Sequence, residues 1–270
     1  MDGRSYHLRM SNIVTYEADA PIAVITLNRP EARNAVNGDV ARSLEAAVDR
    51  LEEDDDVWVA VLRANTEGQE RPVFCAGADL KAINSGQAAE LATERGGFAG
   101  FTFRKRRKPV VVAVDGLATA GGLEIVLACD LVVATRRSAF GLAEAKRNLI
   151  AGAGGLFRLP RAIGKGPALE AILTGEPIPA ERAYELGLVT RLVDDGEADG
   201  EARRLAEQIT ACAPLAVWAS LEVATASFDA DEATLQRMTN EAFARVLGSD
   251  DTREGLEAFI EKRPPRWTGR

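Results

Sequence analysis

The sequence contains a single histidine, His7, among its 270 residues. Catalytic systems that pair histidine with serine or cysteine would have to use that one residue, and a metal site built from several histidines is excluded. If the chain catalyses proton transfer, carboxylates, lysine, tyrosine or cysteine must carry the proton. His7 precedes the first predicted element, and we expect it to lie on the surface.

Cysteine and long apolar runs are also scarce. Cys75, Cys129 and Cys212 are odd in number, widely spaced and form no CxxC pair, which indicates a reducing compartment. Cys75 and Cys129 stand among apolar residues, so we expect both to be buried. The sequence has no run of 18 apolar residues and begins without an apolar signal segment. The sequence therefore predicts a soluble, cytoplasmic protein that does not bind a membrane.

Basic residues are fewer than acidic ones. Lys and Arg number 33 against 41 Asp and Glu, which gives a net charge of −8. This excess of acidic residues disfavours nucleic-acid binding, because proteins that bind nucleic acid carry an excess of basic residues. The chain is long enough to bury a large core without a metal or disulfide, and we expect no metal site.

Apolar strands alternate with helices in the first part of the chain. Strands are predicted at 22–27, 57–63, 110–114 and 131–134, and helices at 37–53, 78–84 and 122–128. After a polar link at 194–200, the pattern is helical only, over 201–212, 214–227, 231–247 and 251–262. We therefore predict an α/β core at 1–195 and a helical C-terminal region at 196–270.

Three glycine-containing segments, 74–81, 116–124 and 150–155, each stand where an apolar strand meets a helix. Small residues there would let a ligand approach backbone N–H groups, and two such groups could form an oxyanion hole. Ordinary strand-to-helix turns are the alternative. None of the segments matches GxGxxG or a P-loop, which disfavours a nucleotide phosphate as ligand.

Two glutamates lie beside these segments. Glu124 is the one acid in the apolar stretch LEIVLAC, and Glu144 precedes the third glycine cluster. A pair of carboxylates could hold a water molecule and share acid–base work. Alternatively, Glu124 is a helix N-terminal acid favoured by the helix dipole, and Glu144 is a surface acid.

The ordered motifs of the chain resemble those of the crotonase (enoyl-CoA hydratase/isomerase) superfamily. They are NRPxxxNA at 28–35, FCAGADLK at 74–81, PVVVAVDGLATAGGLEIVLACDLVVA at 109–134, FGLAEAKRNLIAGAGGLFRLPRAIG at 140–164, LTGEPIPAERAYELGLV at 173–189 and EGLEAFIEKR at 254–263. The resemblance runs from about residue 13 to 263. It implies a crotonase-type spiral of ββα units, a C-terminal helical region for trimerisation, as a homotrimer or dimer of trimers, and acyl-CoA chemistry. Coenzyme A is then part of the substrate, and no separate cofactor is expected.

The resemblance also assigns roles to individual residues. Ala78 and Gly121 match the backbone donors of the oxyanion hole, and Gly152 matches a glycine that helps to position the water. The residues matching coenzyme A contacts are Ala76, Asp79, Leu80, Lys81, Arg33 and Ala35, with Phe259 and Lys262 matching residues that can reach a neighbouring subunit's coenzyme A.

Because both acids of the hydratase pattern are present, the resemblance implies syn addition of water to a trans-2-enoyl-CoA, in fatty-acid or related acyl-CoA catabolism. Glu124 would be the base and Glu144 the acid. Ala120, Asn148 and Ala151 depart from the common hydratase pattern, and the stretch 144–160 resembles carnitinyl-CoA dehydratases. A dehydratase of that kind, an enoyl-CoA isomerase, and an RNA-binding or scaffold paralogue remain as alternatives.

Two further segments have several interpretations. Segment 84–103 mixes Gly96, Gly97 and Gly100 with three phenylalanines, which predicts either an acyl-pocket wall or an exposed loop. The basic run at 104–108 is a solvated helix end, a contact for coenzyme A phosphate or an acidic subunit surface, or an RNA-binding patch.

Overall fold

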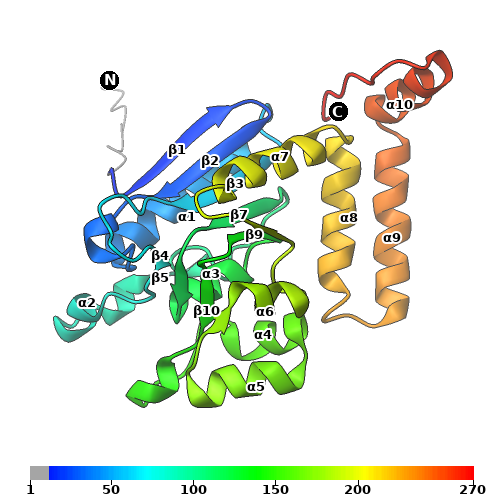
Figure 1. Ribbon diagram of the computed structural model, residues 1–270. Coiled ribbons are helices and arrows are strands. Elements are labelled where there is room, and N and C mark those ends of the chain that lie inside the picture. The colour runs from blue at the N-terminus through cyan, green and yellow to red at the C-terminus, as the bar shows by residue number, and fades with distance from the viewer. Residues whose placement is uncertain (1–11) are drawn as a thin grey trace, which may run out of the picture.

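A computed structural model describes residues 12–270 (Figure 1), so His7 lies outside the described part. The larger of its sheets has six strands. In spatial order they are β1 (Val14–Asp19), β2 (Ile22–Leu27), β3 (Val59–Ala64), β7 (Val110–Val114), β9 (Leu131–Thr135) and β12 (Arg191–Val193). β1 pairs with β2 antiparallel, and the other neighbours pair in parallel.

A second, four-stranded sheet carries the shorter strands. Its order is β11 (Ile178–Pro179), β10 (Ala139–Gly141), β8 (Leu117–Thr119) and β4 (Val73–Cys75). β4, β8 and β10 run parallel to one another, and β11 pairs antiparallel. A separate small hairpin joins β5 (Ala92–Thr93) to β6 (Gly97–Phe98).

The chain alternates between the two sheets in a repeating order. Three pairs of consecutive strands contribute one strand to the larger sheet and the next to the smaller sheet, and a helical segment follows each pair. The pairs are β3 and β4, β7 and β8, and β9 and β10. The helical elements after these pairs are α2 (Leu80–Asn84), α3 (Gly121–Leu127), and the 3-10 helix η3 (Glu144–Arg147) with α4 (Gly155–Ile163). This confirms the predicted spiral of ββα units.

The six-stranded sheet is covered on both faces, which explains why its central strands are apolar throughout. α1 (Gly38–Glu53) packs on one face, and α7 (Ala198–Thr210) crosses the other (Figure 1). Side chains along β3 and β7 alternate between the two cores, as the strand period of two requires. One core receives Ala60, Leu62, Val110, Val112 and Val114, and the other receives Val59, Val61, Val111 and Ala113.

The remaining helices complete the core and build an arm. α6 (Ala180–Glu185) packs against β10 and β11, α5 (Lys165–Thr174) packs against α4, and η2 (Ala88–Leu91) packs against α1 and α2, while η1 (Pro30–Ala32) follows β2. α8 (Pro214–Ala226) and α9 (Glu232–Leu247) run side by side away from the sheets, and α10 (Asp250–Glu261) follows (Figure 1). Since α7 packs on the sheet, the part that stands apart from the core begins at α8 rather than at residue 196.

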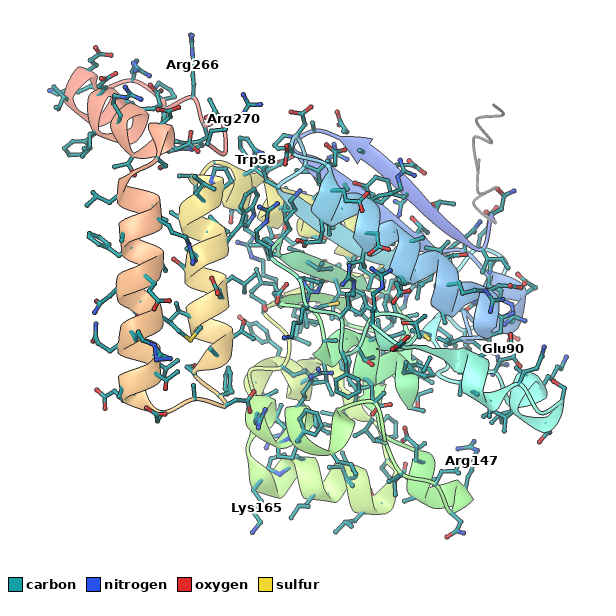
Figure 2. The ribbon with its side chains drawn as sticks, turned by 180° about the vertical axis from the view of Figure 1, so that it is seen from behind. Trp58, Glu90, Arg147, Lys165, Arg266 and Arg270 are labelled. Carbon is teal, nitrogen blue, oxygen red and sulfur yellow. The ribbon has the colours of Figure 1, made fainter. Side chains whose placement is uncertain are left out.

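The base of this arm is tied to the core by aromatic and tail contacts. The Trp218 indole N–H donates to the Trp58 carbonyl oxygen at 3.1 Å. The final residues fold back, so that Arg270 lies near Trp58 in Figure 2, and the Asp251 carboxylate accepts from the N–H groups of Thr268 and Gly269. The arm nevertheless leaves large apolar side chains exposed, namely Phe228, Phe243, Leu247, Leu256, Phe259 and Ile260.

The basic run at 104–108 is not a solvated helix end. It forms a loop before β7, and most of its charges bind inward. Arg104 and Arg106 pair with Asp49 and Asp130 at 2.5 and 2.8 Å. The Lys108 ammonium is fully buried and donates to the carbonyl oxygens of Leu51 and Asp54, at the end of α1. Because these three charges already have partners within the chain, the loop ties α1 to the sheet and gives no support to an RNA-binding patch.

Three further findings concern residues 12–270. No single helix there is long and apolar enough to cross a membrane, although the sharply bent pair α7 and α8 passes the same test on length and composition. The described residues contain no cluster of three or more His, Cys, Asp or Glu side chains suited to a metal. All three cysteines are free thiols, with Cys75 buried, Cys129 partly buried and Cys212 exposed.

Candidate active site

The three glycine-containing segments come together at one edge of the four-stranded sheet. β4, β8 and β10 are parallel neighbours, so the segments that follow them leave the sheet at the same edge. Residues 76–79 follow β4, residues 120–124 follow β8, and residues 142–155 follow β10. The carboxyl ends of parallel strands are where ligand sites of such sheets form.

Two of these segments approach each other backbone to backbone. Gly77 has φ +85°, and a methyl group placed on it would lie 2.8 Å from the Gly121 nitrogen. The backbone position of Ala78 is fixed because both of its neighbours bond to Val36. The Val36 N–H donates to the Gly77 carbonyl, and the Asp79 N–H donates to the Val36 carbonyl, both at 2.8 Å. Only glycine at position 77 permits this approach.

The N–H groups of Ala78 and Gly121 are available to a ligand. Gly121 is the first residue of α3, where backbone N–H groups have no partner inside the helix. Within residues 12–270, neither N–H donates a hydrogen bond to the protein. Two such groups on adjoining segments form the kind of arrangement that stabilises negative charge on an oxygen.

Ala120 shapes the turn that presents Gly121. Its backbone has φ +52° and ψ −128°, a conformation that side chains rarely adopt. The turn is anchored because the Ala120 N–H donates to the Gly141 carbonyl at 2.8 Å, while the Ala120 carbonyl accepts from Leu123 and Glu124. The alanine at a position where many hydratases have glycine is therefore accommodated with strain.

Glu124 is a buried acid held by backbone donors. It lies in α3 with 3% of its surface exposed. Its Oε1 accepts from the N–H of Ala153 at 2.6 Å and from the N–H of Gly155 at 2.9 Å. Burial raises the pKa of Glu124, whereas these two N–H groups and the positive charge of Arg158 oppose that rise. The contacts fix one oxygen and leave Oε2 for another partner.

Glu144 faces the same place from η3. It is half-buried, and its Oε2 is buried without any hydrogen-bond partner among the described residues. Burial raises the pKa of Glu144, and the negative charge of Glu124 raises it further. The two acids are therefore within electrostatic reach, and Glu144 directs an unpartnered oxygen inward. A buried polar atom of this kind calls for a ligand or water.

The third glycine cluster supplies the backbone donors of Glu124. They are the N–H groups of Ala153 and Gly155, while Gly152 is exposed and its contact with a water molecule stays a prediction. Sequence reasoning missed these two donors. Their one signal is Gly154 between them, whose φ of +112° turns the chain into α4.

The segments predicted to contact coenzyme A lie side by side. The Ala76 N–H donates to the Arg33 carbonyl at 3.1 Å, and Ala35 is buried next to the bridge between Val36 and Ala78. Leu80 and Lys81 are exposed at the start of α2. This part of the predicted set forms one surface strip.

Asp79 lies in that strip but its carboxylate is already engaged. It accepts from the Lys81 N–H at the start of α2 and pairs with Arg29 at 2.8 Å. Arg29 also donates to the Ala35 carbonyl at 3.0 Å, so it joins the two segments. The sequence pattern did not single out Arg29, because its partner lies fifty residues away.

Phe259 and Lys262 do not join the site within one chain. Both are exposed at the end of α10, which lies beyond the arm and away from α2 and α3 (Figure 1). Any contact that they make with coenzyme A would have to involve a different subunit.

Fold and site together define the class: a ββα spiral whose smaller sheet carries, at one edge, one buried and one half-buried carboxylate and two backbone N–H groups without a partner among residues 12–270. The chain belongs to the enoyl-CoA hydratase/isomerase family, whose model matches residues 17–270.

Individual relatives match almost the whole chain. The crystal structure of an enoyl-CoA hydratase from Mycobacterium tuberculosis is 46% identical, with a TM-score of 0.90, over 96% of this chain and all of that one. A probable mitochondrial enoyl-CoA hydratase of Dictyostelium discoideum is 34% identical over 98% of this chain and 94% of its own length. A carnitinyl-CoA dehydratase of Salmonella paratyphi A is 37% identical over 97% of this chain and its full length.

Proposed function

We propose that this protein is an enoyl-CoA hydratase that reversibly adds water to a trans-2-enoyl-CoA and forms a 3-hydroxyacyl-CoA. The observation that carries the proposal is the pair of interacting acids, buried Glu124 and half-buried Glu144, on the segments that join the N–H groups of Ala78 and Gly121, which have no partner among residues 12–270. Full-length similarity to hydratases of 34–46% identity supports it.

The proposed reaction uses each group once. The thioester oxygen accepts from the N–H groups of Ala78 and Gly121, which stabilise the negative charge that develops there. Ionised Glu124 takes a proton from water, and the water oxygen bonds to C3 of the enoyl group. Protonated Glu144 gives its proton to C2, and in dehydration the two acids exchange roles.

The bonding of the two acids supports this division. Two N–H donors favour the ionised form of Glu124. Glu144 has a raised pKa and an unpartnered oxygen, which suits an acid that holds a proton until the substrate arrives. Because the acids interact, their protons are lost in steps that belong to the pair.

Substrate binding is proposed for the surface strip. Arg33, Ala35, Ala76, Leu80 and Lys81 would contact coenzyme A, while Asp79 positions the strip through Arg29. We propose that Gly152 contacts the active-site water. No separate cofactor is expected, because the substrate supplies coenzyme A.

Assembly and location are proposals of the same kind. The apolar side chains exposed on α8–α10 favour a homotrimer or dimer of trimers, in which Phe259 and Lys262 would reach a neighbouring subunit's coenzyme A. We propose a cytoplasmic location and a role in fatty-acid or related acyl-CoA catabolism. Fractionation of the source cells tests the location, since the relative from Dictyostelium carries a mitochondrial name.

The test follows loss of the enone thioester absorbance with crotonyl-CoA and a panel of longer enoyl-CoAs. We expect Glu124→Gln and Glu144→Gln each to lower kcat by about 100-fold or more. Glu222→Gln is the matched control, because Glu222 is exposed and pairs with Arg245 between α8 and α9, away from the acids. Hydration within about threefold of wild type in either active-site variant would contradict the assignment.

A carnitinyl-CoA dehydratase is the second candidate. Relatives with that name are 37% identical over 97% of this chain and the whole of their own length. Ala151 and Asn148 also depart from the common hydratase pattern, and Asn148 adopts φ +55°, which asparagine tolerates. Turnover of carnitinyl-CoA without hydration of crotonyl-CoA would favour this candidate.

A further inference from the structure

Arg158 is a charged side chain beside the site that the proposed reaction does not use. It lies in the first turn of α4, just after the loop that holds Glu124. Its Nη2 donates to the Thr102 carbonyl at 2.6 Å, and its Nη1 donates to the Ala153 carbonyl at 3.3 Å. One guanidinium therefore joins the segment after the β5–β6 hairpin to the peptide unit next to the Glu124 contact.

The position of this guanidinium is fixed from several sides. Its carbon lies 5.1 Å from the ring centre of Phe103 and 5.5 Å from that of Phe157. A methyl group on Gly154 would lie 2.6 Å from Nη1, so the glycine leaves room for the charge against the backbone. Cation–π contacts of this kind stabilise a partly desolvated arginine.

The segment that Arg158 binds through the Thr102 carbonyl also borders the oxyanion donors. Phe98, in β6, places its ring against the α-carbon of Gly121, where any side chain on Gly121 would overlap it. Thr102 follows within the same turn, since its N–H donates to the Phe98 carbonyl at 3.1 Å. Arg158 therefore links the wall beside the oxyanion donors to the loop beside the acid.

Few charges surround Glu124. Those that act on it or share its site are Arg158 from α4 and Glu144 from η3. β4 and β8, which also pack against α3, carry no charged residue and contribute the buried thiol of Cys75. On its other side Arg158 faces Arg106 and Arg161, whose charges repel it. Arg158 is thus the cation that acts on Glu124.

We propose that Arg158 is a positioning residue for Glu124: it holds the Ala153 carbonyl, next to the N–H that binds the carboxylate, fixes that loop to the Phe98 segment, and favours the ionised acid. The proposal rests on the proposed hydratase function and deepens it, because it names the group that prepares the base. The opposing effects of burial and of Arg158 on the pKa of Glu124 agree with this role.

The test compares Arg158→Met and Arg158→Lys with a matched control, Arg161→Met. Arg161 lies on the same helix, also stacks on Phe157 and pairs with exposed Asp229. Two readouts are taken: the pH profile of kcat/KM for crotonyl-CoA, and the titration of the glutamate carboxylates by 13C NMR. The second readout does not depend on turnover.

For Arg158→Met we expect the Glu124 titration and the acidic limb of kcat/KM to move up by about one pH unit, since an opposite charge has been removed. We also expect kcat to fall by about tenfold with little change in KM, because the base is displaced rather than the binding strip. Arg158→Lys should keep the acidic limb and still lose kcat, because one ammonium cannot span both carbonyls. Arg161→Met should match wild type.

Two results would overturn the proposal. One is an unchanged carboxylate titration in Arg158→Met, which would leave Arg158 with a purely structural role. The other is a wild-type kcat in Arg158→Lys, a variant that keeps its charge and serves also if the methionine variant fails to fold. If wild-type protein hydrates no enoyl-CoA, the proposed function fails, whereas the NMR titration still decides the coupling of Arg158 to Glu124.

Discussion

Replacing Ala120 with glycine is expected to stabilise the protein. Ala120 has φ +52° and ψ −128°, and a non-glycine residue in such a region costs about 1–3 kcal/mol. Glycine relieves that strain but gives the unfolded chain additional freedom, which costs about 0.4–1 kcal/mol. Ala120 is only partly buried, so the lost methyl contributes little. The net gain in unfolding free energy should be about 0.5–2 kcal/mol.

Ala118→Gly provides the matched control two residues away. Ala118 is fully buried in β8 and pairs with Phe140 in β10. Glycine at this position removes a buried methyl and adds freedom to the unfolded chain, and the native backbone has no positive φ here whose strain glycine could relieve. We expect a loss of about 1–2 kcal/mol. The same chemical change should therefore have opposite signs at positions 118 and 120.

Equilibrium urea unfolding, followed by circular dichroism at one fixed protein concentration, measures both variants, since assembly would make stability depend on concentration. The midpoint should rise for Ala120→Gly and fall for Ala118→Gly, with unchanged slopes. An Ala120→Gly variant less stable than wild type would refute the argument from strain.

Further predictions concern the site and the basic loop. Gly77→Ala should lower the hydration rate by about 100-fold or more, because the methyl would lie 2.8 Å from the Gly121 nitrogen; a near-normal rate in the enone assay would contradict this. Burial raises the pKa of Glu144, so its contribution to stability is full below the pKa of an unfolded glutamate and is lost as the pH rises through the native value. Glu144→Gln cannot ionise, so its unfolding free energy minus that of wild type should be larger at about pH 8 than at about pH 4. Urea unfolding of both proteins at the two pH values checks the sign. Lys108→Met leaves two buried carbonyl oxygens at the end of α1 without their donor, and should destabilise the protein by about 2–4 kcal/mol in the same unfolding assay.

Much of the larger sheet could be predicted because its inner strands, β2, β3, β7 and β9, have five or six residues each and are mostly buried. The predicted strands 22–27 and 110–114 coincide with β2 and β7, and helix α1 begins after Asn37, whose side chain accepts from the Val40 N–H as a cap. The smaller sheet was not predicted as strands. β4, β8 and β10 have three residues each, which is too short for a period of two to be recognised. The motif resemblance alone implied that part of the spiral.

Glu124 was found because a glutamate inside an apolar stretch next to glycines is unusual, and Glu144 because it precedes a glycine cluster and matches the second acid of the family motif. Their partners were not found, because the direction of a backbone N–H depends on local dihedral angles that spacing does not reveal. Ala153 and Gly155 are donors only because Gly154 adopts a positive φ. The basic loop was misjudged for a related reason: its partners Asp49 and Asp130 come from other elements, and consecutive charges in a sequence suggest exposure.

The two glutamates differ in a way that matters for the proposed reaction. Both are buried enough to have raised pKa values, and each has a cation that opposes the rise, Arg158 at Glu124 and Arg147 at Glu144, yet only Glu124 accepts hydrogen bonds from a neighbouring loop. The N–H groups of Ala153 and Gly155 thus stabilise negative charge at Glu124, whereas Oε2 of Glu144 has no hydrogen-bond partner among residues 12–270. When two interacting acids share a site, the proton resides on the one whose ionised form is less stabilised. In the proposed mechanism, that asymmetry favours the proton on Glu144 before the substrate binds and an ionised Glu124 that accepts a proton from water.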